Sequence, residues 1–388
     1  MSRCNLIIDT PTIHASNHGQ MCLQSRVVFT GHEKKLWLSV EERYAKYLCA
    51  ERGDAFVIGL LPVAMRNGLD IVSEAPVDER LLYQIQSTLM PLLSRYGKNV
   101  HEVKIEAPIA TSPIENAGSV GAGISCGVDS LHIVKNHTGD DYPGLKLTHL
   151  VLNNVGAFAN DKNSVFQHKW TIDLARKFCQ EYGYELIVTD SNIFEFTNGD
   201  FETQHTYLNI FAAYCLQKLW KVFYYGSGGI DFMKGFTLVE HEKHDCSAYD
   251  LISLDALSSS SLKIYSEGAA YERLDKLAHI VDFEPAQKYL QVCVRGIGKN
   301  CGKCVKCART LLMLDYLGAL DKFSKVFNVD AYKKERHWYL RYLYRCQIRG
   351  HEHRMLDTVY DKFRHDIGLA DKLIVYATMV KNVFSRFR

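Results

Sequence analysis

The sequence has no long hydrophobic run and almost no net charge. Its 46 Lys and Arg residues are matched by 44 Asp and Glu, which leaves a formal charge of +2 and no global field that would attract nucleic acid. No apolar stretch approaches the roughly 20 residues that a membrane-spanning helix needs. The first apolar run, NLII at 5–8, is short and is followed by Asp9, so we expect no signal peptide and no membrane partner.

The twelve cysteines lack the pattern of a disulfide-rich secreted protein. Four of them lie within residues 293–307, and the other eight are scattered singly. Cys49, Cys179 and Cys215 stand in apolar stretches, where free buried thiols are common. We therefore expect a reducing, cytoplasmic environment. The apolar content of 47% can supply a sizeable core, and the length fits two or three domains.

The segment VGAGISCGVDSLHIVKN, residues 120–136, has the layout of a phosphate-binding turn between a strand and a helix. Gly127 lets backbone N–H groups close on an anion, and the N-terminus of the following helix adds unpaired donors. Ser125 and Ser130 can donate hydrogen bonds to phosphate, whereas Asp129 would repel phosphate unless a cation lies between them. The segment predicts a nucleotide bound with Mg²⁺; the alternative is an ordinary turn capped by Asp or Ser.

A second motif places four cysteines within fifteen residues, three of them in C-x-x-C-x-x-C spacing. Thiolates at this spacing can converge on one tetrahedral ion, and the glycines among them give the backbone room to wrap around it. Four thiolates fill all the positions of such an ion, so the site would be structural. We predict bound Zn²⁺; an iron–sulfur cluster, disulfides and free thiols are the alternatives. The predicted ligands are Cys293, Cys301, Cys304 and Cys307.

In these two segments the chain resembles the PP-loop ATP pyrophosphatase superfamily, and within it the 7-cyano-7-deazaguanine synthases. That family has an S-G-G-x-D-S loop after its first core strand. It ends with one cysteine followed by C-x-x-C-x-x-C and a nearby arginine. Here the loop is SCGVDS at 125–130, and the arginine is Arg309. The resemblance covers roughly residues 115–320, with both motifs in the order that the family has.

The resemblance implies an enzyme that adenylates a carboxylate with ATP, releases pyrophosphate into the loop and transfers the acyl group to ammonia or an amine. The carboxylate would belong to a 7-deazaguanine-type substrate. In this family the amide can be adenylated again and converted to a nitrile. We expect catalytic roles for Asp129, which would hold Mg²⁺, and for Ser130. The expected ATP-binding residues are Ser125, Cys126, Gly127, Val128, Asp129, Ser130, Gly226 and Ser227.

Two features depart from the family. Cys126 stands where the loop normally has its first glycine, and about a hundred residues precede the core while some sixty follow it. Such flanking regions are similar to those of PP-loop proteins from biosynthetic or antiviral defence gene clusters. Two alternatives stay open. One is a tRNA-modifying PP-loop sulfurtransferase; the other is a non-catalytic synthase-like module in a defence or biosynthetic complex, with the loop inactivated by Cys126.

The hydrophobic patterns predict three regions. Residues 1–112 are expected to form an α+β domain without visible chemistry. Residues 113–325 alternate strand and helix, which predicts a doubly wound parallel sheet with the nucleotide at the carboxyl ends of the strands. The strand ends at Asn153–Asn154 and Gly226–Ser227 would line one crevice, although the second is equally typical of a glycine turn. Residues 326–388 are expected to be a helical, basic extension.

Two polar clusters lie between the core strands and the cysteines. The segment EHEKHDC at 240–246 is dense in His and acidic residues. A solvated loop is one interpretation; by the resemblance, Asp245–Cys246 would belong to the substrate pocket. Further along, Arg273 and Lys276 lie within one helical turn and can bind a carboxylate or phosphate. A surface ion-pair face is the simpler alternative.

The region from 331 to 388 contains 13 Lys and Arg against 6 Asp and Glu, interleaved with aromatic residues. Basic and aromatic residues together can bind nucleic acid. Trp338 and Tyr342 are four residues apart, however, and Tyr339 and Leu343 repeat that spacing. This spacing is typical of a packed helix face, so packing is favoured over nucleic acid or an acidic protein partner.

Overall fold

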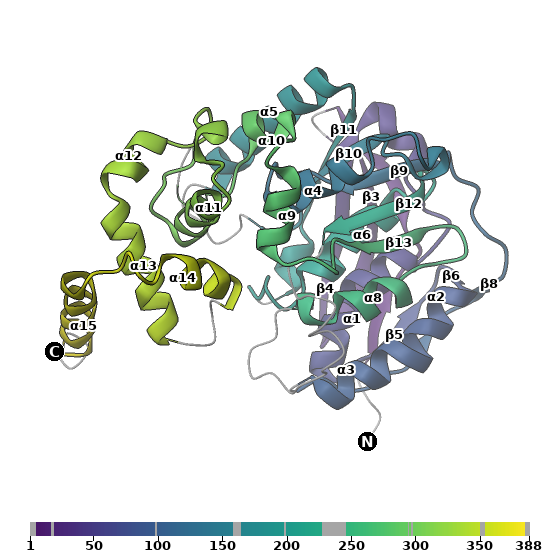
Figure 1. Ribbon diagram of the computed structural model, residues 1–388. Helices are drawn as coiled ribbons and strands as arrows, with labels where there is room; N and C mark the ends of the chain where they lie inside the picture. Colours follow the sequence, from purple (N-terminus) through teal and green to yellow (C-terminus); the bar gives the residue numbers. More distant parts are fainter. Residues whose placement is uncertain are drawn as a thin grey trace. The chain divides into compact units, whose positions relative to one another are not determined.

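The computed structural model describes residues 5–16, 19–97, 99–157, 164–197, 199–226, 246–293, 295, 298–349 and 354–384. The chain divides into two compact units. Unit 1 comprises residues 1–125 and 133–270, and unit 2 comprises residues 126–132 and 271–388. The long strands belong to unit 1, whereas the described part of unit 2 is built mainly from helices (Figure 1).

Unit 1 contains an eleven-stranded mixed sheet, so the predicted α/β class is confirmed. Its parallel part has the strand order β13-β12-β9-β10-β11. Numbered along the chain from β9, this is the order 5-4-1-2-3 of a doubly wound fold, in which the direction of winding reverses beside the first strand. These strands are β9 (Ser119–Gly123), β10 (His149–Asn154), β11 (Glu185–Ser191), β12 (Trp220–Gly226) and β13 (Lys263–Glu267).

The expected boundary near residue 112 falls inside this unit, because β4 pairs antiparallel with β11 and continues the sheet. From β4 the order runs on through β3, β1, β5 and β7, with β2 paired to β3. A separate two-stranded sheet joins β6 to β8. The strands are β1 (Asn5–Ile8), β2 (Thr12–Ala15), β3 (Gln20–Phe29), β4 (His32–Glu41), β5 (Asp70–Ser73), β6 (Val77–Asp78), β7 (Ile105–Glu106) and β8 (Ile109–Ala110).

Helices complete the core of unit 1. The apolar segment DAFVIGLLPVAMRN forms α1, which packs against α6 and buries nearly every side chain. Gly121 of β9 lies against the Trp220 ring. A Cβ at this position would lie 2.7 Å from the ring, which explains why the residue is a glycine. The α-helices described wholly within this unit are α1 (Asp54–Asn67), α2 (Glu79–Gln84), α3 (Met90–Tyr96), α5 (Ser164–Tyr182), α6 (His205–Cys215) and α8 (Asp250–Ala256).

A buried carboxyl group makes the stability of unit 1 depend on pH. Asp54 is 1% exposed and accepts a hydrogen bond from the Asp78 N–H at 2.8 Å. Burial, together with the negative charge of Asp78, raises the pKa of Asp54 to about 7. Between about pH 4 and pH 7 the folded chain therefore keeps a proton that the unfolded chain releases, and stability falls as pH rises.

We expect the free energy of unfolding to fall by on the order of 1 kcal/mol per pH unit in this window. Asp54→Asn should flatten the slope, because the amide keeps the hydrogen bond to Asp78 but does not titrate. Urea unfolding at pH 5 and pH 7 measures the effect, with exposed Asp255→Asn as the matched control. If the free energy of unfolding of wild type and Asp54→Asn changes equally between pH 5 and pH 7, Asp54 is ionised throughout this pH range.

Unit 2 contains the first residues of α4 (Val128–Asn136) and a set of helices from α9 onward. As the aromatic spacing predicts, Tyr339, Tyr342 and Leu343 are buried in α13, while Trp338 at the edge is 36% exposed. The later helices are α9 (Arg273–Ile280), α10 (Glu284–Tyr289), α11 (Val305–Tyr316), α12 (Val329–Lys334), α13 (Arg336–Arg349), α14 (Asp357–Phe363) and α15 (Leu369–Phe384).

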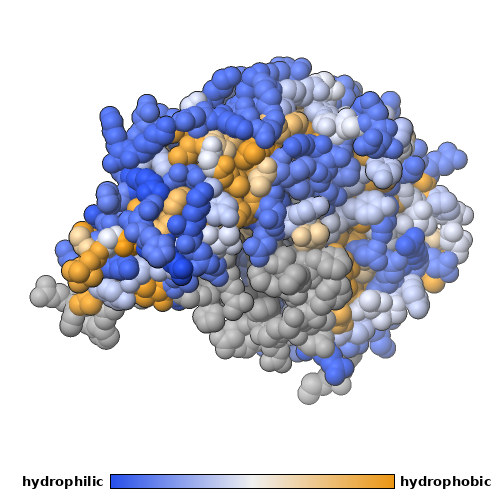
Figure 2. Space-filling view, in the orientation of Figure 1, coloured by the Kyte–Doolittle hydropathy of each residue, from blue (hydrophilic) through white to orange (hydrophobic). Residues whose placement is uncertain are grey.

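The last helix, α15, packs on α13 and exposes apolar side chains. Leu369 is 75% exposed, Leu373 60% and Val380 55%. In Figure 2, hydrophobic surface lies at the left edge of the view, where Figure 1 draws α15. Among the residues that the structure describes, α15 and the other helices are all too short or too polar to cross a membrane.

Candidate functional site

The predicted phosphate-binding loop follows β9. Ile124 still pairs with the sheet, since its N–H donates to the Val151 carbonyl at 2.8 Å, and α4 begins at Val128. The Gly127 carbonyl accepts the Leu131 N–H at 3.0 Å and the Ser130 hydroxyl at 3.1 Å. The sequence therefore forms the predicted strand–loop–helix.

Cys126, the departure from the family pattern, keeps the backbone conformation of a glycine. Its φ is +54°, in the left-handed region that is costly for residues with a Cβ. The thiol is nevertheless buried, at 1% exposure. Within unit 2, its carbonyl accepts the Gln291 N–H at 2.8 Å, which helps to hold the turn in this conformation.

Asp129 is bound by two cations from α9. Its two carboxylate oxygens lie 3.1 Å from the Arg273 guanidinium and 3.1 Å from the Lys276 ammonium. The interpretation of this pair as a surface ion-pair face is wrong for Lys276, which is 1% exposed. Burial alone would raise the pKa of Asp129, but the charges of Arg273 and Lys276 outweigh it and lower the pKa.

Two cations on α11 add to this charge. Lys306 and Arg309 interact electrostatically with both Asp129 and Arg273. Partial burial and then the charge of Arg273 lower the pKa of Arg309. In addition, the Nε atom of Arg273 is buried without a hydrogen-bond partner among the described residues. Four cations around one carboxylate leave an excess of positive charge beside the loop, which an anion can neutralise.

Two histidines that the sequence analysis missed lie close to this cluster. The Nδ1 atoms of His132 on α4 and His279 on α9 are 3.2 Å apart, so one ring donates and the other accepts. His132 is 2% exposed and its ring also contacts Tyr271, with centroids 5.4 Å apart. The pattern of α9 offered no signal for this pair, because the two histidines are 147 residues apart.

The four predicted ligands do converge. The Sγ atoms of the cysteines all lie within 4.8 Å of one another, and those of Cys293 and Cys304 are 3.9 Å apart. A tetrahedral zinc ion with bonds of about 2.3 Å needs sulfur atoms roughly 3.8 Å apart, so the arrangement is compatible with zinc. An iron–sulfur cube would have to lie between the thiolates and would force them further apart. The converging residues are Cys293, Cys301, Cys304 and Cys307.

Backbone and side-chain donors hold these thiols in place. The Cys304 N–H points to the Cys301 sulfur at 3.3 Å, and the Cys304 sulfur caps α11 by accepting the Cys307 N–H at 3.5 Å. Asn300, which the sequence analysis also missed, accepts the N–H of Cys293 at 3.1 Å and donates to the Leu290 carbonyl at 2.8 Å. The start of α11, and with it Lys306 and Arg309, is therefore positioned by the cysteine cluster.

No family model matches the chain, and comparisons with curated proteins and with solved structures also found no match. The chemistry of the loop, the cations and the cysteines is therefore what defines the site.

The strand ends predicted to line a crevice lie at one edge of the sheet in unit 1, because β10 and β12 both run parallel to β9. Asn153 accepts the Thr189 hydroxyl at 2.8 Å, and Asn154 donates to Asp190 at 2.7 Å. Gly226 is the last residue of β12. Ser227 and the segment 240–245 lie outside the described residues.

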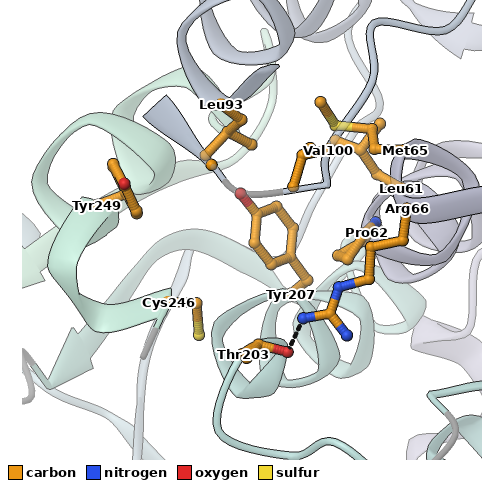
Figure 3. Close-up of a pocket in the computed structure, with 11 residues that line it drawn as sticks. Leu61, Pro62, Met65, Arg66, Leu93, Val100, Thr203, Tyr207, Cys246 and Tyr249 are labelled. Atoms are coloured by element: carbon orange, nitrogen blue, oxygen red, sulfur yellow. Dashed lines mark hydrogen bonds between the residues drawn. The ribbon is translucent and has the colours of Figure 1, made fainter. Parts of the chain in front are cut away.

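A pocket elsewhere in unit 1 lies between α1, α3 and α6. Figure 3 shows Tyr207 near its centre, surrounded mainly by aliphatic side chains such as Leu61 and Leu93. Its charged lining residue, Arg66, is already bound to Asp200 at 2.9 Å and to Thr203. The pocket suits an apolar group, and it contains no residue of the loop or the cysteine cluster.

Proposed function

We propose that the protein is an ATP-dependent adenylating enzyme, which activates a carboxylate as an acyl-adenylate and releases pyrophosphate. The observation that carries the proposal is the cationic cluster around Asp129 in unit 2, where Arg273 and Lys276 contact a residue of the phosphate-binding loop itself. An anion bound there would meet the loop backbone and several cations at once, which suits pyrophosphate.

The chain's own residues would act as follows. A carboxylate oxygen of the substrate attacks the α-phosphorus of ATP, and the bond from that phosphorus to the pyrophosphate oxygen breaks. Arg273, Lys276 and Lys306 would neutralise the charge that develops on pyrophosphate. The backbone from Ser125 to Ser130 would orient the phosphates.

The Mg²⁺ expected at Asp129 does not fit this arrangement directly. Each carboxylate oxygen of Asp129 is already bound to a cation, at 3.1 Å in both cases. In the proposed step the cationic side chains therefore supply the positive charge that Mg²⁺ would otherwise bring. Zn²⁺ at the four cysteines would be structural, because four thiolates leave no open position for a substrate.

The substrate class follows from the resemblance to the 7-cyano-7-deazaguanine synthases. We propose a 7-deazaguanine-type carboxylate, with ammonia or an amine as the nucleophile that displaces AMP from the acyl-adenylate. This leaves an amide, and a protein partner is not required for either half-reaction.

The test is ATP turnover by purified protein, with and without 7-carboxy-7-deazaguanine and ammonium. We expect AMP and pyrophosphate rather than ADP and phosphate, and a loss of at least about 100-fold in Arg273→Met. Arg341→Met is the matched control, because Arg341 is also paired with an aspartate in unit 2, at 2.7 Å from Asp371.

Formation of ADP and phosphate would contradict the proposal. Absence of both turnover and ATP binding would favour the non-catalytic module instead. If ATP binding then appears only in Cys126→Gly, the Cys126 side chain is the cause of the missing ATP binding in the wild-type protein.

A further inference from the structure

The pocket between α1, α3 and α6 has no part in the proposed reaction, and every residue that lines it belongs to unit 1. Leu61 and Met65 of α1 form part of its wall and are 0% and 1% exposed. Leu93 of α3 and Val100 add further aliphatic surface. Both α1 and α3 precede the region 115–320, so the family resemblance gives no expectation for this pocket.

A buried tyrosine supplies the pocket with a polar group. Tyr207 of α6 is 4% exposed, and Figure 3 shows its ring near the centre of the pocket, with the hydroxyl end directed toward Leu93. This hydroxyl lies 3.5 Å from the hydroxyl of Ser253 on α8, whereas hydrogen bonds between hydroxyls are usually about 2.7–2.8 Å long. No closer partner of the Tyr207 hydroxyl is present in the described part of the chain. A buried donor with one long hydrogen bond gains free energy from a closer acceptor.

The Tyr207 hydroxyl keeps its proton at neutral pH. Burial raises the pKa of Tyr207 above the usual value for a tyrosine, so the phenol is a donor to any acceptor that enters the pocket. When its proton is given to a ligand, the Tyr207 oxygen can accept the proton of the Ser253 hydroxyl. Both buried hydroxyl groups are then satisfied at once.

The charge of the lining favours an uncharged ligand. Arg66 is the charged residue among those that line the pocket, and its guanidinium lies 2.9 Å from Asp200 and also donates to Thr203. Because Asp200 neutralises Arg66, neither a carboxylate nor an ammonium group would meet a net opposite charge here. Burying an unpaired charge against aliphatic side chains is costly, so a charged ligand is disfavoured.

We propose that this pocket binds a small uncharged molecule with an apolar body and one carbonyl-type acceptor. The apolar body packs against the aliphatic side chains of α1 and α3, which supply most of the binding free energy, and Tyr207 donates a hydrogen bond to the acceptor and fixes its orientation. The inference does not depend on the adenylating function, because the pocket shares no residue with the phosphate-binding loop or the cation cluster.

Two probes of the same shape isolate the hydrogen bond. Acetophenone has a carbonyl oxygen where α-methylstyrene has a CH₂ group, and saturation-transfer NMR on the full chain gives the dissociation constant of each. In Tyr207→Phe we expect acetophenone to bind about 5-fold more weakly than in wild type, the usual size for one hydrogen bond. The affinity for α-methylstyrene should stay within about 2-fold, because this probe has no acceptor to lose.

A third probe and two further variants test the charge and the location. Benzoate should bind wild type at least about 10-fold more weakly than acetophenone, because its carboxylate finds no free cation in the pocket. Val100→Phe places a ring inside the pocket and should weaken both neutral probes by about 10-fold or more. Tyr224→Phe is the matched control, since Tyr224 is also buried in unit 1 but donates to the Leu145 carbonyl at 2.8 Å, outside the pocket.

Urea unfolding shows whether each variant folds, and Tyr207→Phe keeps the shape of the side chain, so the test does not depend on Val100→Phe alone. Equal acetophenone affinity in wild type and Tyr207→Phe overturns the proposal, as does a parallel loss of both neutral probes in this variant. Benzoate that binds as tightly as acetophenone overturns the uncharged ligand class. Acetophenone that binds a folded Val100→Phe as tightly as wild type, or does not bind wild type, overturns the site itself.

Discussion

Asp129→Asn is expected to lower the free energy of unfolding by about 3–5 kcal/mol and to abolish adenylation. The reason is the burial of its partner: Lys276 is 1% exposed, and the substitution removes the carboxylate charge that lies 3.1 Å from its ammonium group. Removing one charge of a buried ion pair is more costly than removing both, because the remaining charge stays buried. The same cations would also lose the carboxylate that orients them toward the loop.

Chemical unfolding and AMP release measure the two effects separately. Adding Lys276→Met to Asp129→Asn should recover part of the lost stability, because the buried charge is then removed, but it should not recover turnover. Since the pKa of Asp129 is lowered in the folded state, its stabilising effect should be present at neutral pH and be lost as pH falls toward that pKa. Wild-type stability in Asp129→Asn would show that the ion pairs contribute nothing.

Cys304→Ser is expected to release the metal and to unfold the region around α11. Cys304 is buried, lies 3.9 Å from the Cys293 sulfur and also caps α11. The binding free energy of structural zinc in small sites is about 10–16 kcal/mol, which is as large as the whole stability of many domains. Elemental analysis should find one zinc per wild-type chain and less than a tenth of that in the variant.

Cys346→Ser provides the matched control, because Cys346 is a buried cysteine of the same unit on α13, outside the cluster. It should keep its zinc and lose at most about 1–2 kcal/mol of stability. Iron in place of zinc, or a full metal content in Cys304→Ser, would contradict the predicted site.

Local patterns accounted for the elements that carry the motifs. The alternation of strand and helix predicted for residues 113–325 is present, for example in β10, α5 and β11 in chain order. The buried helix α1 was visible only as an apolar segment, since a helix that is apolar on every side has no periodic signal. The pairing of β4 with β11 was not predictable, because strand partners are set by which edges meet and not by the strand sequences alone.

The sequence by itself determined the two chemical motifs of this protein. The spacing of Cys301, Cys304 and Cys307 places their sulfur atoms within reach of one ion, and a loop between strand and helix is a local property of residues 123–130. Only the tertiary structure brought Lys276 to Asp129 and His279 to His132, each pair 147 residues apart. The physical reason is that charge pairs and hydrogen bonds between distant segments depend on packing, which leaves no periodic trace in either segment.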